Sequence, residues 1–317
     1  MLRLLLVLLV GCLLPACDRL KSYVERYSAT TLEDGEPVSS PGHYERRFLF
    51  LDGQENPNAA VFDFTATVDS AGRIRRTARV WLSRAGQWEP LVDTIWEAPP
   101  MREPWRLVPY GPLRLIVGLA DTLEALVYRD ARRELRLVPG EQLAQWQGTA
   151  GTEIGLHRAE LHIEKNRISG ILFDLQFGSD GLPAPHTIPT HGAADSLAPS
   201  AGPYEALAFL SDGKEIDVML VSDTSGLLAW VRQGKTAEKW DGAGLEPLGQ
   251  PRGESSTSWR LTSPQGALRG ELRASGQPQP LPWPRFTETK APNYYPVRGW
   301  ITVRGKRTSV SGLVRQS

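Results

Sequence analysis

The sequence predicts an all-β protein made of two tandem antiparallel β-barrels or sandwiches, with few and short helices. Three observations support this fold class. The 317 residues include 30 glycines and 25 prolines, which favours many turns between short strands over long helices. Apolar residues recur mainly with a period of two. The second half of the chain also repeats parts of the first.

The repeat consists of four blocks that recur in the same order. One shared Trp-Arg-Leu string would mean little, but an ordered series of four indicates an internal duplication. The paired blocks are Phe50–Gly53 with Leu210–Gly213, Val80–Leu82 with Ala229–Val231, Trp105–Arg114 with Trp259–Arg269, and Arg167–Ile171 with Arg307–Leu313.

Strands are expected wherever apolar and polar residues alternate. Phe62 and Phe64 share one side of a strand over residues 60–68, and a short turn containing Gly72 joins it to a strand over residues 74–82. The same pattern predicts three more hairpins, over residues 159–163 with 171–177, 216–221 with 227–231, and 301–303 with 312–314.

One helix is expected, over Leu119–Tyr128, with Asp121 as its N-cap. The segment is ambiguous because Leu123, Ala125 and Val127 also alternate as they would in a strand.

The first 16 residues are predicted to be a lipoprotein signal peptide. Arg3 precedes the apolar run Leu4–Ala16, which at about 13 residues is shorter than the ~20 residues of a transmembrane helix. The string Leu-Pro-Ala-Cys that ends at Cys17 resembles the lipobox of bacterial lipoproteins. Cys17 is therefore the predicted lipidation site. Cys12 and an ordinary secretory signal are the alternatives.

A lipid-anchored protein would lie on a membrane without crossing it. Asp18 resembles the signal that retains lipoproteins in the inner membrane, which predicts the periplasmic face of that membrane, with the outer membrane as the alternative. Beyond the signal peptide we expect a tether over residues 17–44, a first β domain over 45–180, a proline-rich linker over 181–203 and a second β domain over 204–317.

Composition excludes several classes of function. Cys12 and Cys17 are the only cysteines, so the folded part has no disulfide, no cysteine-ligated zinc and no cysteine nucleophile. The 36 Lys and Arg residues balance 36 Asp and Glu residues, which argues against nucleic acid as a partner. The motifs of serine hydrolases, zincins, P-loop NTPases and dinucleotide-binding folds are missing, and no cofactor or metal is predicted.

The second half resembles the carotenoid 1,2-hydratase and AttH-like family of double lipocalin-like proteins. The resemblance implies two lipocalin-like barrels and a pocket for an apolar ligand or an isoprenoid substrate. At His43–Phe48 this chain has two arginines where the family has tryptophans, and Arg298 replaces an acidic residue. The matching segments are Leu207–Glu215, Met219–Asp223, Trp259–Gly266, Tyr294–Gly299, Val303–Gly305 and Ser311–Leu313.

Candidate catalytic residues are His43, Glu45 and Arg298, if they approach one cavity in which an acid and a base activate an alkene or water. The alternative is a surface strand and an ion pair at a barrel rim. Trp105 and Trp259 either plug the ends of the two barrels or line a ligand pocket.

The remaining polar candidates are histidines and their neighbours. Glu160, His162 and Glu164 share one side of a strand and form either a cation site or a solvated face. His157 lies on the parity of Leu161 and is expected to be a satisfied core residue. Two histidines lie in the proline-rich linker, as a metal clip or as free surface residues: His186 and His191.

Three functions follow from these observations. The first is a membrane-tethered protein that binds an apolar small molecule or assists an export complex such as an ABC-type transporter. The second is a hydratase-like or cyclase-like enzyme acting on an isoprenoid. The third is a non-catalytic interaction lipoprotein with filled barrels. The contents of the barrel lumens distinguish them.

Overall fold

Alternating apolar residues form antiparallel strands throughout the described part of the chain, which confirms the all-β fold class. The structure is a computed structural model. The residues it describes are 42–54, 58–84, 87–99, 106–108, 110–118, 123–147, 153–178, 205–223, 226–248, 258–275, 279–280 and 293–316. The predicted lipidation site Cys17, as well as Asp18, Trp105, His186 and His191, lies outside these ranges.

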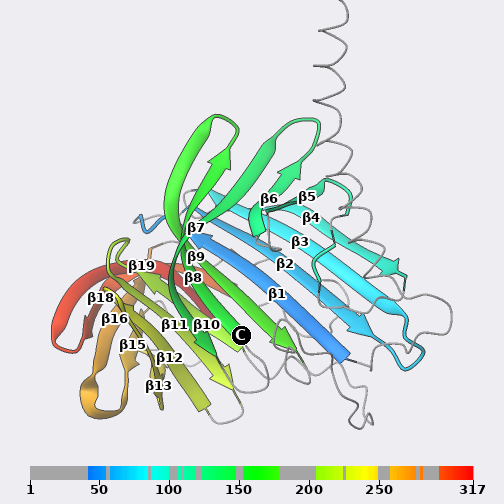
Figure 1. The fold of residues 1–317 in the computed structure, drawn as a ribbon. Helices are drawn as coiled ribbons and strands as arrows, with labels where there is room; N and C mark the ends of the chain where they lie inside the picture. Colours follow the sequence, from blue (N-terminus) through cyan, green and yellow to red (C-terminus); the bar gives the residue numbers. More distant parts are fainter. Residues whose placement is uncertain are drawn as a thin grey trace, which may run out of the picture.

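The first half forms one curled nine-stranded sheet in the order β4-β3-β2-β1-β9-β8-β7-β6-β5 (Figure 1). Each strand is antiparallel to its neighbours. The strands are β1 (Gly42–Leu51), β2 (Ala59–Val68), β3 (Ile74–Arg84), β4 (Gln87–Ala98), β5 (Leu113–Val117), β6 (Leu123–Arg129), β7 (Glu134–Gln147), β8 (Glu153–Ile163) and β9 (Asn166–Gly178).

The second half forms a ten-stranded sheet in which nine strands follow the order β13-β12-β11-β10-β19-β18-β16-β15-β14 and β17 pairs with β18. The strands are β10 (Glu205–Ser211), β11 (Ile216–Asp223), β12 (Gly226–Gln233), β13 (Thr236–Asp241), β14 (Gly244–Pro247), β15 (Ser258–Thr262), β16 (Leu268–Ala274), β17 (Gln279–Pro280), β18 (Asn293–Val303) and β19 (Lys306–Gln316). A 3-10 turn, Pro264–Gly266, precedes β16.

The two strand orders correspond position by position, as an internal duplication requires. Three of the four repeated blocks lie on strands that occupy the same place in the two sheets: the ends of β1 and β10, the middles of β3 and β12, and the last strands β9 and β19. The Trp-Arg-Leu block does not correspond. Leu113 begins β5, the ninth strand of the first order, whereas Leu268 begins β16, the seventh of the second.

The helix expected over Leu119–Tyr128 is wrong, because residues 123–129 form strand β6. Leu126 and Tyr128 face the lumen of the first sheet, while Ala125 and Val127 lie on the opposite face and are also buried. A strand buried on both faces is apolar at consecutive positions, as residues 125–128 are, and such a run fits a helix as well as a strand. Residues 119–122 lie outside the described ranges.

Each sheet encloses a lumen filled by its own side chains. Phe48, Phe50 and Phe62 lie at the centre of the first apolar cluster and are fully buried. Trp259 and Tyr295 lie in the second, with ring centroids 5.2 Å apart. These clusters take every second residue of the strands, as the pleat requires.

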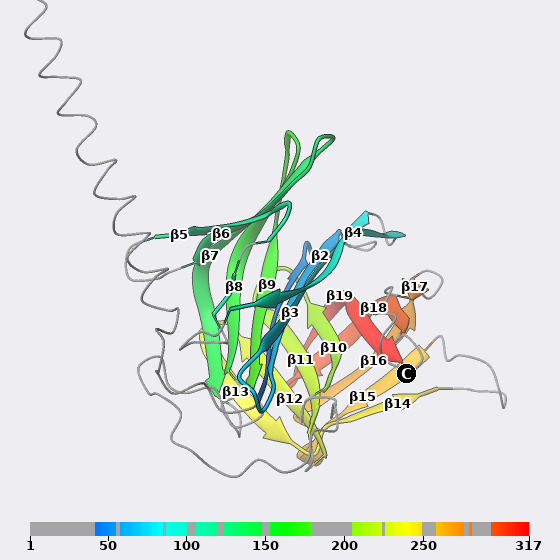
Figure 2. The ribbon, with the colours of Figure 1, turned by 90° about the vertical axis from the view of Figure 1, so that its right-hand side faces the viewer.

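A third apolar cluster holds the two sheets together. Leu49 and Leu51, on the outer side of β1, belong to it, and so do side chains from β10, β11, β12 and β19. Trp146 meets Trp230 edge to face at 5.8 Å. Phe173 meets Phe209 at 5.3 Å. The two halves therefore share a core in which strands from both sheets bury their outer faces. Figure 2 shows the strands of the two sheets lying beside each other.

The ends of each nine-strand path are not paired with each other in the described part of the structure. Side chains brace the first sheet instead. Arg133, in the turn after β6, donates hydrogen bonds of 2.7 and 2.8 Å to Glu89 of β4. In the second sheet Arg304 donates to Glu238 of the edge strand β13. Within the described ranges, no helix is long and apolar enough to cross a bilayer.

Trp230→Ala is expected to destabilise both halves together, by about 3 to 5 kcal/mol, because Trp230 is fully buried in the shared core. Urea unfolding should remain a single transition with a lower midpoint. The control Val117→Ala, at an exposed position, should change stability by less than ~0.5 kcal/mol. A second-half transition that shifts alone would contradict the shared core.

Candidate functional site

His43 and Glu45 lie on the outer face of β1, and Glu45 is also among the residues that line a small cavity at this end of the first sheet. His43 is 3.2 Å from the hydroxyl of Thr67. Glu45 accepts a hydrogen bond of 2.6 Å from Arg47 two residues along the strand. The structure thus places both predicted residues on one face of one strand, with polar partners.

Glu45 is the first member of a row of alternating charges across β1 to β4. Arg47 lies 3.5 Å from Asp63, Asp63 lies 3.8 Å from Arg79, and Arg79 lies 3.1 Å from Asp93. Asp63 is 1% exposed, and burial raises the pKa of this carboxyl. The two flanking guanidinium groups supply the opposite charge that a buried carboxylate requires, so removal of either arginine would leave buried charge uncompensated.

Arg298 lies in the other sheet, on β18, opposite Arg273 and Ser311 in the register of its neighbours. Its side chain is exposed, whereas Val297 beside it faces the second lumen. Trp259 is buried against Tyr295 and fills that lumen, as expected for a plug.

Glu160 and His162 are neighbours on β8, as their shared parity predicts. The ring of His162 is 3.2 Å from Glu160, and Arg167 also donates to Glu160. Glu164 lies in the following turn with φ 56°. No group of three or more His, Asp or Glu side chains that could hold a metal ion occurs among the described residues.

His157 faces the first lumen, as its parity with Leu161 predicts. It is partly buried, makes a hydrogen bond to the Gly140 backbone, and packs over Gly155. Asp174 in β9 lies nearby and receives two hydrogen bonds from Arg46, of 3.0 and 2.7 Å. Burial lowers the pKa of His157, and Arg46 adds to this, while Asp174 acts in the opposite direction.

A small cavity of about 20 Å³ lies at the end of the first lumen where β1 begins. Two arginines and three aromatic rings line it, which makes it a polar site. Its volume holds about one water molecule. The inward-facing residues that line it include Tyr44, Arg46, Phe64, Arg76 and Trp96.

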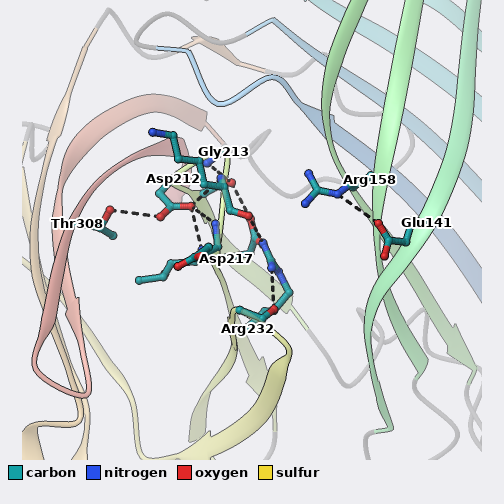
Figure 3. A network of polar contacts seen from close by, with 12 residues as sticks. Glu141, Arg158, Asp212, Gly213, Asp217, Arg232 and Thr308 are labelled. Atoms are coloured by element: carbon teal, nitrogen blue, oxygen red, sulfur yellow. Dashed lines mark hydrogen bonds and ion pairs between the residues drawn. The ribbon is translucent and has the colours of Figure 1, made fainter.

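A much larger space, a cleft of about 540 Å³, lies outside both lumens where β7, β8 and β9 face the second sheet. Val138 and Ile171 line it with apolar side chains, and Glu141 and Arg158 add a charged pair 3.4 Å apart. Gly213, in the turn after β10, belongs to the second sheet. Figure 3 shows the charged pair on the first sheet facing this turn.

The wall formed by the second sheet is a tightly bonded turn. Asp212 accepts hydrogen bonds from the backbone N–H groups of residues 214, 215 and 216, at 2.8 to 2.9 Å. Behind it, the buried carboxylate of Asp217 accepts hydrogen bonds from Ser211 and Arg232. These bonds fix the wall before any ligand arrives (Figure 3).

The matching turns of the two repeats touch at this wall. A side chain on Gly53 would meet the Cα of Gly213 at 3.3 Å, and both glycines have positive φ, of 69° and 71°. Asp52 caps the first turn and also lines the cleft. Only glycine combines this close approach with a left-handed backbone.

Sequence reasoning missed the cleft. Glu141, Arg158 and Ser169 come from three strands and share no motif, and Gly213 comes from the other half. Two signals were available: Glu160, which its shared parity with His162 had singled out and which lines the cleft, and the repeated Asp-Gly pair of the duplication.

No protein-family model matches the chain, and no curated protein matches it. Among solved structures, a candidate AttH protein from Nitrosomonas europaea is similar over 90% of this chain and 98% of its own, with 11% identity and a TM-score of 0.46. A DUF3598-family protein of unknown function from Nostoc punctiforme is similar over 86% and 94%, with 14% identity and a TM-score of 0.16. The fold described above depends on the strand order and not on these likenesses.

His157 is expected to titrate below the usual histidine pKa of about 6.5. The unfolded chain then takes up the proton first as the pH falls below that value, so the free energy of unfolding decreases with acidification. His157→Gln should remove this part of the pH dependence. An NMR titration that gives His157 a pKa at or above the usual value would contradict the burial argument.

Proposed function

We propose that this protein is a non-catalytic binding protein, tethered to a bacterial membrane through lipid on Cys17, whose ligand site is the cleft between the two sheets. The observation that carries the proposal is the contrast in volume between the cleft, at about 540 Å³, and the lumen cavity, at about 20 Å³. Small-molecule sites usually occupy ~300 to 1,000 Å³.

The lumens give little support to a lumenal site, either for an apolar ligand or for an isoprenoid substrate. An apolar ligand or an isoprenoid chain would have to displace the packed side chains of either lumen, such as Phe62 or Trp259. The proposed acid of a hydratase, Glu45, lies on the outer face and already accepts a hydrogen bond from Arg47. These features favour binding over catalysis.

The tether is supported by the sequence alone. A short apolar run, a small residue and Cys17 form the lipobox-like string, and Asp18 favours retention in the inner membrane. A binding protein held at the periplasmic face would be placed to serve an export complex or an ABC-type transporter.

Filling the cleft tests the site. Ser169 is exposed on β9 and lines the cleft, while Ser309 is exposed on the corresponding strand β19 and is not among the lining residues. We expect mass spectrometry to find a small molecule that co-purifies with the wild-type protein and with Ser309→Trp but is lost from Ser169→Trp. Equal retention by both variants, or nothing bound to the wild type, would contradict the cleft as the site.

Removing the acylated sulfur tests the tether. Cys17→Ser should move the full-length protein from the membrane fraction to the soluble fraction, because several acyl chains anchor far more strongly than any surface contact. Cys12→Ser should leave fractionation unchanged, since Cys12 lies within the predicted signal peptide, which the mature protein lacks. Recovery of Cys17→Ser in the membrane fraction would contradict anchoring through lipid on Cys17.

A further inference from the structure

The residues that line the cleft carry more negative than positive charges. Asp52, Glu141 and Glu160 contribute three carboxylates, and Arg158 contributes the one guanidinium group among the residues that line the cleft. At neutral pH the formal charge of this lining is negative. A concave wall of one dominant sign concentrates ligands of the opposite sign.

The ion pair between Glu141 and Arg158 can be replaced by an ion pair between Glu141 and a ligand cation. Glu141 and Arg158 are 3.4 Å apart, and their side chains are 72% and 55% exposed. Exposed pairs of this kind contribute little to stability, so a ligand cation can replace Arg158 beside Glu141 without a large cost to the fold.

Glu160, a half-buried carboxylate of the lining, is held in its charged form. Arg167 and His162 donate to Glu160, and these hydrogen bonds lower its pKa. Glu160 therefore remains an anion through the physiological range, and a carboxylate can accept several further hydrogen bonds.

The lining of the cleft also has an apolar part. Val138 and Ile171 lie among the charged groups, and Ile171 also belongs to the shared core of the two sheets. A ligand that fits both parts of the lining carries donors at one end and a short apolar body at the other.

We propose that the cleft binds small molecules in which a protonated primary amine is joined to a short apolar body. This inference rests on the proposed function, since it names the class of ligand that the cleft takes. The amine would lie between Glu141 and Glu160, and the apolar body would lie against Val138 and Ile171.

Three probes of one shape test the inference: phenethylamine, 2-phenylethanol and 3-phenylpropionate, which differ mainly in their charge. Calorimetric titration of the full-length protein in neutral detergent at low salt is expected to rank them in that order. The amine should bind about tenfold more tightly than the alcohol. Glu141→Gln should weaken the amine severalfold and strengthen the propionate, because Arg158 loses its partner.

Glu164→Gln is the matched control. Glu164 is an exposed carboxylate in the turn after β8 and is not among the residues that line the cleft, so its substitution should leave all three affinities unchanged. A thermal melt of each variant shows that it is folded.

The outcomes separate this inference from the proposed function. Equal binding of amine and alcohol, abolished by Ser169→Trp, would overturn the ligand class and leave the cleft as the site. Amine binding that persists in Ser169→Trp would overturn both. Failure of phenethylamine to bind, or an affinity for phenethylamine that is unchanged in Glu141→Gln, would overturn the ligand class.

Discussion

The shared apolar core between the two sheets is the constraint on which the rest of the structure depends. Strand β1 has one set of side chains in the first lumen and the other, including Leu49, against the second sheet. Burial of apolar area on both faces contributes far more than the ion pairs at the rim. It therefore sets how the two sheets lie against each other, and with that the walls of the cleft.

In this duplicated fold, the packing of the two sheets forms the cleft while both lumens stay filled. Packed side chains fill each lumen and make each half rigid. Each half also has a turn with an Asp-Gly pair, and the two turns approach each other at Gly53 and Gly213. The cleft lies beside that contact, with charged residues from the first sheet on one side and a turn of the second on the other. Its geometry follows from the packing of two rigid bodies and needs no mobile element.

Much of the fold could be predicted from the sequence, because strands with one polar face keep their alternation, as β8 does over residues 159–163. The prediction failed at β6, which is apolar at the successive positions 125–128 and so also fits a helix. The candidate site could not be predicted. Its residues converge only after two sheets have packed, and neither Glu141 nor Arg158 has a neighbour in the sequence that signals this.

Native-state hydrogen exchange tests the shared core most directly. Amides of β1, such as Leu49, and amides of β10, such as Phe209, should exchange with the same free energy and the same dependence on denaturant, because their side chains belong to one cluster. Exchange of β10 at a clearly lower free energy than β1 would mean that the second sheet opens alone, and the cleft would then lack a fixed second wall.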